Sequence, residues 1–405
     1  MLGDLDTFFV EVERLHMPHL RGRPVVIGGR PGGRGVVAAC SYEAREFGIR
    51  SAMPMAEAYR RVWRAGGVVV DGPFAGNRVE GLNRNGAGIR RGGTQTAQRR
   101  LDLPTGAGLR GRPVHFLHTN LFGNYDRYSR RVQEVLRSEA PVFRAKSIDE
   151  FEMDVTGCER LFSRNFGGMV GFAEHVRRRV REEVGLKLSI GIGPSRLVAK
   201  MASRHAKPDG VYRVPPEEVE RFLTPHDVQA VPGIGPATAA TLRSRGVDRV
   251  EQLLALPRRM LLATFGIGMP RLLDALTGNG DEEHGPYFGY EESDLEGGVK
   301  QKRQPKSIGH ESTFARDESS PEAVERTLWR LTEDACRRLR AANLRTRHVT
   351  VKIRYSDFAT LTHGAMLEEP TDTDSAVFAA VRQLFCEGHT KSQRCLLYTS
   401  PSPRD

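Results

Sequence analysis

The chain is poor in cysteine, and the few cysteines are not arranged in pairs. It has five among 405 residues, and no two of them form a Cys-x-x-Cys motif. Disulfide frameworks and structural zinc sites both depend on such pairs. We therefore expect neither, and we interpret the cysteines as reduced thiols of an intracellular protein.

Long apolar segments are also missing. No run of about 18 apolar residues occurs, which argues against a membrane-spanning helix. The first four residues, Met-Leu-Gly-Asp, turn acidic at once and lack the basic and then apolar pattern of a signal peptide. We expect a cytoplasmic protein with no membrane partner.

Acidic residues are fewer than basic ones. The chain has 50 Asp and Glu against 61 Lys and Arg, giving a net charge of +11 and a pI of about 9.7. Lys and Arg release the counterions condensed on a phosphate backbone, so this excess favours a nucleic-acid partner. An acidic protein surface or membrane headgroups would also satisfy the charge alone.

Two segments lack the apolar periodicity of a packed element. Residues 66–113 are rich in Gly and Arg, and we expect a disordered insertion because such a stretch buries too little apolar surface to offset its ordering entropy. An arginine-rich arm that grips nucleic acid is the alternative. Residues 395–405 resemble nothing before them, and we expect a non-native tail outside the fold.

Elsewhere the periodicity predicts an α+β protein of several domains. Short helices joined by Gly-rich turns fill residues 217–280, and a polar stretch at 287–306 suits a linker. An α+β domain follows, with strands at 309–314, 349–355 and 360–367 and helices at 321–342 and 375–386. In the first half we expect strands at 2–10, 25–27, 36–39, 151–155 and 188–192, with helices at 55–62, 125–140 and 168–183 and another through residue 206.

An acidic motif is the first candidate site. Asp4 and Asp6 are two apart on a predicted strand and so point to one face. Asp149 and Glu150 open another strand. Carboxylates gathered from two strands suit Mg²⁺, and two such ions can activate a hydroxyl and stabilise a leaving phosphate. Solvated turn residues are the alternative.

Basic residues and a glycine hairpin form the second candidate. Arg45 follows a strand and could hold a phosphate through its planar fork. Lys200 and Lys207 are two helical turns apart and share a face, although a solvated helix face would look the same. Gly233 and Gly235 lie in Val-Pro-Gly-Ile-Gly-Pro before a helix, a pattern typical of the helix-hairpin-helix grip on a DNA backbone, or of a simple tight turn.

These pieces occur in an order that resembles the Y-family DNA polymerases, most closely the DNA polymerase IV branch. The similarity covers most of residues 3–64 and 116–385. It is carried by the segments DLDTFFVEVE, GVVAACSYEAREFGIRSAMPMAEA, YDRYSRRVQEVL, SIDEFEMDVTG, LSIGIGPSRLVAKMASRHAKPDG, VPGIGPATAATL, KSIGHESTFARD and VTVKIRYSDFATLTHGAMLEEPTD.

The resemblance implies a right-handed polymerase. Its domains would be a palm at 1–10 and 114–214, fingers at 11–65, a helical thumb at 215–286 and, after the linker, an incomplete little finger at 307–394. The metal ligands would be Asp4, the backbone carbonyl of Leu5, Asp149 and Glu150. Asp6 would then be structural.

The resemblance also implies the substrate contacts. Tyr42, Arg45 and Lys207 would hold the incoming triphosphate, and Phe9 would be the steric gate that excludes a 2′-hydroxyl. Ala39 stands where the family usually has a hydroxyl, which removes one phosphate contact. The DNA contacts would come from Gly233, Gly235 and the basic strand residues Lys352 and Arg354.

The implied function is low-fidelity DNA synthesis on a template, in translesion synthesis and DNA repair. Two Mg²⁺ ions would be the cofactors, and primer-template DNA and deoxynucleoside triphosphates the partners of a monomer. A sliding clamp is a further candidate partner, although we expect the last little-finger strand and a clamp-binding tail to be absent. The alternatives are a catalytically impaired DNA-binding relative and a nucleotidyl cyclase; a cyclase would need neither the hairpin nor the C-terminal domain.

Overall fold

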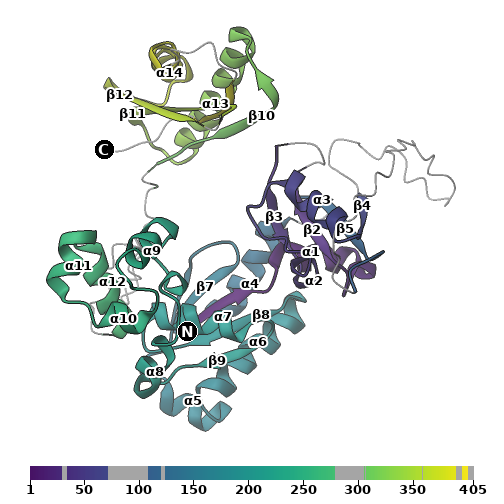
Figure 1. The fold of residues 1–405 in the computed structure, drawn as a ribbon, viewed down its shortest axis with the longest axis vertical. Coiled ribbons are helices and arrows are strands. Elements are labelled where there is room, and N and C mark those ends of the chain that lie inside the picture. Colours follow the sequence, from purple (N-terminus) through teal and green to yellow (C-terminus); the bar gives the residue numbers. More distant parts are fainter. Residues whose placement is uncertain are drawn as a thin grey trace. The chain divides into compact units, whose positions relative to one another are not determined.

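The computed structural model describes residues 1–29, 34–71, 108–119, 124–278, 305, 307–357, 359–388 and 395–399. The chain divides into two compact units (Figure 1). The first holds residues 1–30, 36–53 and 57–293, and the second holds 294–405 with the short segments 31–35 and 54–56. None of the described helices is long and apolar enough to cross a membrane.

A five-stranded sheet, here called the palm sheet, forms the centre of the first unit. Its order is β6-β7-β1-β8-β9, and β1 pairs antiparallel with both neighbours. Apolar side chains of β7 and β8 pack on one face against helices α4, α5 and α6. The bounds are β1 Leu2–Leu5, β6 Val142–Ala145, β7 Glu150–Asp154, β8 Leu188–Ile192, β9 Val211–Arg213, α4 Tyr125–Glu139, α5 Glu159–Phe166 and α6 Met169–Val184.

Helix α7 (Arg196–Ala206) covers the other face of the palm sheet. It lies so close to β8 that a Cβ atom at Gly191 would stand 2.1 Å from the carbonyl oxygen of Ala199. Glycine is therefore required at this position, because any side chain would push the helix off the sheet. The close fit fixes the helix that carries Lys200 relative to β1.

The first strand is shorter than the predicted segment 2–10. β1 ends at Leu5, and helix α1 begins at Phe8 and runs to His16. Thr7 between them has a φ of 43°, a left-handed conformation that no strand or helix continues through. Asp6 lies just past the end of the strand, yet its carboxylate contacts Ser189, the register partner of Asp4, so the two acids lie on the same side of the sheet as predicted.

A second sheet, the fingers sheet, has the order β3-β2-β5-β4. β5 pairs parallel with β2 and β4. Two predictions are corrected here: residues 114–118, expected in the palm, belong to this sheet, and residues 68–71 and 113 of the expected insertion form β4 and the first residue of β5. Residues 72–107 lie outside the described part. The bounds are β2 Val25–Gly28, β3 Val37–Cys40, β4 Val68–Asp71, β5 Pro113–His118, α2 Tyr42–Arg45 and α3 Met55–Arg64.

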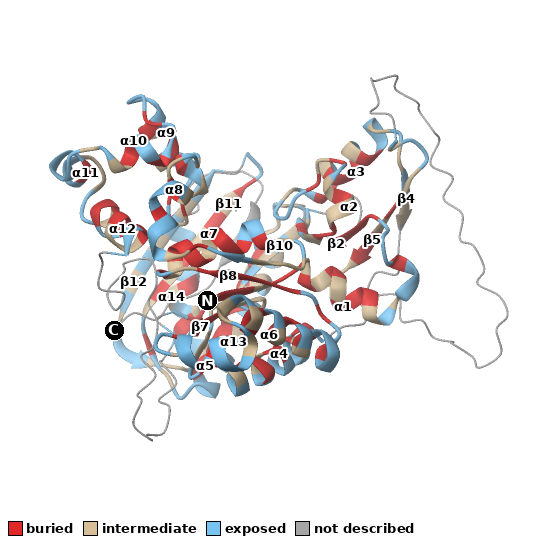
Figure 2. Ribbon diagram, turned by 90° about the horizontal axis from the view of Figure 1, so that it is seen from below, coloured by how far each residue is buried: buried red, intermediate tan, exposed pale blue. Residues whose placement is uncertain are grey.

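Short helices complete the first unit over the range expected for the thumb. Their apolar side chains form a core shared with α7, and Figure 2 shows buried residues on the inner sides of these helices. The bounds are α8 Val219–Leu223, α9 Pro236–Arg243, α10 Val250–Leu254, α11 Arg258–Phe265 and α12 Gly268–Thr277, with short 3-10 turns at Pro216–Glu218 and Val228–Ala230.

The second unit is a four-stranded sheet of order β10-β13-β11-β12 with two helices packed on it. Residues 395–399 form β13, which pairs with both β10 and β11. The expectations that this segment lies outside the fold and that the last strand is absent were therefore wrong. The predicted linker falls almost wholly outside the described residues. The bounds are β10 Glu311–Glu318, α13 Pro321–Ala341, β11 Thr346–Tyr355, β12 Thr360–Thr371, α14 Asp374–Gly388 and β13 Cys395–Thr399.

Candidate active site

Three carboxylates gather where β1 and β7 lie side by side. The Cα of Asp4 is the register partner of that of Glu150. The next residue along, Leu5, donates its backbone N–H to the carbonyl oxygen of Asp149 over 2.9 Å. The sheet thus joins residues almost 150 positions apart in the sequence, which neither acidic motif could reveal alone.

The turn before β7 is held by a side chain that the sequence interpretation overlooked. Ser147 accepts backbone N–H groups from Asp149 (3.2 Å) and Glu150 (3.0 Å) through its hydroxyl oxygen. The same hydroxyl donates to the carboxylate of Asp149. Asp149 therefore sits in a fixed turn directly beside Leu5, and Ser-x-Asp was the available sequence signal, because Ser favours such local side-chain turns.

Two lysines balance the charge of the carboxylates. Lys207 contacts Asp4 at 2.5 Å, and Lys200 reaches both carboxylate oxygens of Glu150 at 2.9 and 3.0 Å. Lys200 lies on α7, whereas Lys207 caps its C-terminal end in an extended conformation. The two lysines do face one site, although not as positions of one continuous helix.

Burial makes the charge on Asp4 costly. It raises the pKa of this carboxyl to about 6, with the neighbouring Asp149 and Glu150 adding to the rise and Lys207 opposing it. A carboxylate in such surroundings is stabilised by a nearby cation. The site thus favours positive charge.

The donor set fits divalent metal ions. Carboxylate oxygens are the hard ligands that Mg²⁺ prefers, and each of Asp4 and Glu150 already holds a cationic group. Within the described part of the chain, no three side chains of His, Cys, Asp or Glu lie close enough together to enclose an ion.

Asp6 has a different environment from the other acids. It is 2% exposed. One of its oxygens accepts the hydroxyl of Tyr42 (2.9 Å), and the other accepts the hydroxyl of Ser189 (2.7 Å) and the backbone N–H of Asp209 (2.8 Å). Because protein donors occupy both oxygens, Asp6 ties the fingers helix α2 to the palm sheet, in keeping with the structural role implied above.

Arg45 has a buried guanidinium nitrogen without a hydrogen-bond partner among the described residues. Helix α2 starts at the cap residue Ser41, whose hydroxyl accepts the N–H of Ala44. One turn on, the Arg45 guanidinium lies 4.6 Å from the ring centre of Tyr42. The buried nitrogen is its Nε. A buried unpaired N–H is costly, so a bound phosphate would relieve it.

Phe8 and Phe9 differ in burial at the start of α1. Phe8 is 3% exposed and belongs to the palm core. Phe9 is half-buried and stacks on Tyr125, with ring centres 4.1 Å apart and planes at 8°. The Tyr125 hydroxyl in turn donates to buried Glu13 (2.7 Å). Tyr125 therefore fixes the Phe9 ring, a support that sequence periodicity did not reveal.

The expected DNA contacts lie in both units. Gly233 has a φ of 100°, which favours glycine, and Ile234 beside it is buried and anchors the hairpin. Gly235 caps α9 and borders open space. In the second unit, Lys352 and Arg354 lie on β11, half-exposed, where Lys352 is 3.7 Å from Glu311 and Arg354 donates to the Thr360 hydroxyl.

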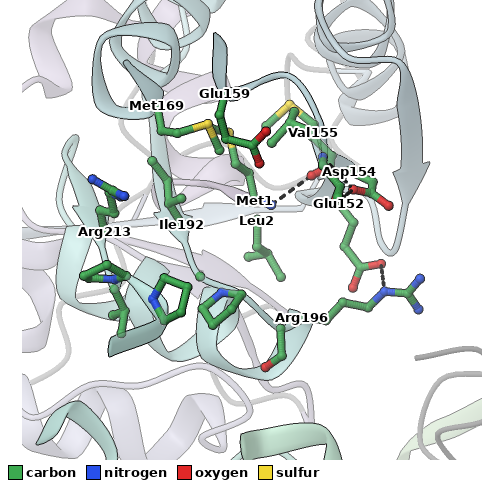
Figure 3. A pocket seen from close by; sticks show the side chains of 18 of the residues that line it. Met1, Leu2, Glu152, Asp154, Val155, Glu159, Met169, Ile192, Arg196 and Arg213 are labelled. Carbon is green, nitrogen blue, oxygen red and sulfur yellow. Dashed lines mark hydrogen bonds and ion pairs between the residues drawn. The ribbon is translucent and has the colours of Figure 1, made fainter. Parts of the chain in front are cut away.

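A cavity of about 390 Å³ lies at the opposite end of the palm strands from the acids. It opens beside the first residues of β1 and the last residues of β7 and β8 (Figure 3). Glu152 on its wall forms an ion pair with Lys146 (3.0 Å), and Met1 donates its terminal amine to the Met153 carbonyl (2.8 Å). None of the predicted site residues lines it.

The arrangement of strands and helices is that of the Y-family DNA polymerases. A Y-family polymerase chimera, Dbh-Dpo4(243-245)-Dbh, matches 99% of this chain and 97% of its own with a TM-score of 0.72 at 20% identity. The insertion ternary complex of Dbh DNA polymerase matches with a TM-score of 0.56 at 18% identity, over 100% of this chain and 98% of the other. The predicted fold class is thereby confirmed.

The sequence comparisons are more specific. The chain belongs to the impB/mucB/samB family: the family pattern matches residues 3–204 and its C-terminal domain matches 305–397. DNA polymerase IV of Halorhodospira halophila is 33% identical over 96% of this chain and 90% of its own. DNA polymerase IV of Dehalococcoides mccartyi (strain BAV1) is 32% identical over 94% of this chain and 80% of its own. The match through residue 397 reaches into β13.

Proposed function

We propose that this chain is a DNA-directed DNA polymerase of low fidelity that extends primers in translesion synthesis and DNA repair. The observation that carries the proposal is the pairing of adjacent strands that sets Asp4, Asp149 and Glu150 beside one another, with Lys200 and Lys207 contacting Glu150 and Asp4. Relatives named DNA polymerase IV, at 32–33% identity over nearly the whole chain, support it.

Asp4, Asp149, Glu150 and the carbonyl of Leu5 would hold two Mg²⁺ ions. Bound there, the ions would activate the primer 3′-hydroxyl and stabilise the charge that develops on the transferred phosphate. Lys200 positions the Glu150 carboxylate through contacts to both of its oxygens. The Ser147 turn holds Asp149 beside Leu5.

The incoming deoxynucleoside triphosphate is held by Tyr42, Arg45 and Lys207. Arg45 offers an unpaired buried N–H, and Lys207 offers an ammonium group that Asp4 releases once another cation neutralises that carboxylate. Phe9, braced by Tyr125, bars a 2′-hydroxyl from the sugar pocket. A rigid ring excludes the larger sugar more strictly than a mobile one.

Primer-template DNA is held mainly through its phosphates. The hairpin at Gly233 and Gly235 presents backbone N–H groups at the start of α9, and Lys352 and Arg354 supply charge on β11. Phosphate contacts carry no sequence information, as a polymerase that copies any template requires. The protein works as a cytoplasmic monomer. A sliding clamp is a further candidate partner, and a pull-down with the clamp would test it.

A primer-extension assay with a Mg²⁺ titration tests the proposal. We expect incorporation that follows the template base and disappears when EDTA removes the metal. A protein that binds primer-template DNA yet adds no nucleotide with either Mg²⁺ or Mn²⁺ would be the impaired relative considered above, and the proposal would be wrong. Template-independent release of cyclic nucleotide would indicate the cyclase.

A further inference from the structure

The outer face of helix α3 carries an aromatic and basic patch that the proposed function leaves unused. Trp63 lies near the end of this helix and is 64% exposed. The packed side of the helix adjoins Trp63: Tyr59, one turn earlier, stacks on Phe116 of β5 with ring centres 4.0 Å apart. The buried residues of that inner face are Met55, Ala58, Tyr59 and Val62. The fold therefore needs the inner face of α3 and makes no evident use of Trp63.

Trp63 is unusual within this chain. The only other tryptophan, Trp329, is 38% exposed and is covered by the edge of Phe378 at 4.8 Å. The nearest described ring to Trp63 is Tyr59, at 6.3 Å and tilted by 54°, so it does not stack on the indole. A large apolar ring left in water is a feature of binding surfaces.

Arginines flank the exposed indole. Arg60 and Arg64 are exposed; because Trp63 and Arg64 lie three and four positions after Arg60, Arg60 neighbours both of them on the helix surface. Arg60 forms an ion pair with Glu57 at 3.3 Å. Arg64 makes no ion pair within the part of the chain that the structure describes. Arg61 differs, because it donates to the carbonyl of Gly48 (2.7 Å) and so belongs to the scaffold.

We propose that Trp63, Arg60 and Arg64 bind single-stranded DNA, with a base stacked on the indole and phosphates on the two arginines. The chemistry is that of single-strand binding sites, which combine aromatic platforms with a positively charged track. Duplex DNA does not suit the patch, because its bases are already stacked on each other and present no free face to an indole. We identify the bound strand as the unpaired template ahead of the primer, and this identification rests on the proposed function.

Tryptophan fluorescence tests the site directly. In a Trp329→Phe background, whose single indole is Trp63, we expect an oligothymidine to quench the emission and added salt to reverse the quenching. Trp63→Ala and Arg64→Gln should each weaken oligothymidine binding about fivefold or more, measured by anisotropy of a labelled oligomer. Arg130→Gln, which removes an exposed arginine of α4, should leave it unchanged. Emission unaffected at saturating oligomer, or equal affinity of Trp63→Ala and the parent, would overturn the proposal.

A second measurement separates this inference from the polymerase assignment. Lengthening the 5′ template overhang from one nucleotide to about ten should tighten primer-template binding by the parent protein but not by Trp63→Ala. An equal gain in both proteins would overturn the template-strand role. Nucleotide insertion by the parent on the one-nucleotide overhang reports on the proposed function alone, so absent insertion with preserved quenching would contradict only the polymerase proposal.

Discussion

The acidic end of the palm sheet and the glycine hairpin of the thumb range are built in opposite ways. The acids come from segments almost 150 residues apart and meet only because β1 pairs with β7. The hairpin is made within a few residues, from the positive φ of Gly233 and the buried Ile234. Long-range pairing assembles the candidate chemical site, whereas local backbone conformation makes the candidate DNA grip, so the two should be separable by mutation.

The largest effect should come from Asp4→Asn. The change keeps the shape of the side chain but removes a charge that two metal ions need, so primer extension should fall at least ~1000-fold, or about 4 kcal/mol of barrier. Single-turnover insertion kinetics would measure it. Glu134→Gln, an exposed acid of α4, is the matched control. If Asp4→Asn lost DNA binding in proportion to activity, the two regions would not be separable.

Phe9→Ala should relax the choice of sugar. Removing the ring removes the clash with a 2′-hydroxyl, so the preference for deoxynucleotides over ribonucleotides should fall on the order of 100-fold, with deoxynucleotide insertion changed far less. Steady-state kinetics with matched pairs would decide it. An unchanged selectivity ratio in a stable variant would rule out the gate. Phe8→Leu, in the core, should lower stability without changing the ratio.

Gly233→Ala should weaken the DNA grip without touching the chemistry. A Cβ at a φ of 100° is strained, by roughly 1–2 kcal/mol, and the hairpin should distort. Affinity for primer-template DNA should drop about tenfold while insertion at saturating DNA stays near the parent rate. Gly235→Ala is the matched comparison, since its backbone is extended and its surroundings are open. Equal losses in both variants would point away from backbone conformation as the cause.

The smallest effect should come from deleting residues 76–110. If this segment is an insertion, its removal should leave primer extension within about tenfold, or 1.4 kcal/mol. Extension by a folded deletion variant would measure it. Complete loss of activity would show that the segment takes part in synthesis.

Sequence periodicity located most strands and helices, because their apolar faces are local patterns. The errors arose where distant segments decide the outcome. The left-handed Thr7 cut the first strand short, and the parallel pairing of β5 moved residues 114–118 to the fingers sheet. β13 enters the sheet between β10 and β11 despite its atypical composition. In the site, the acids could be proposed from the resemblance, but the contacts of Lys200, Ser147 and Tyr125 needed coordinates.

Counting bound metal ions tests the central claim most directly. Mn²⁺ can be titrated by electron paramagnetic resonance into the protein with primer-template DNA and a non-reacting nucleotide analogue. We predict that the parent protein binds two ions and that Asp149→Ala/Glu150→Ala loses at least one while its DNA affinity is kept. Equal Mn²⁺ binding by the parent and the double variant would contradict the assignment of these carboxylates as the metal ligands.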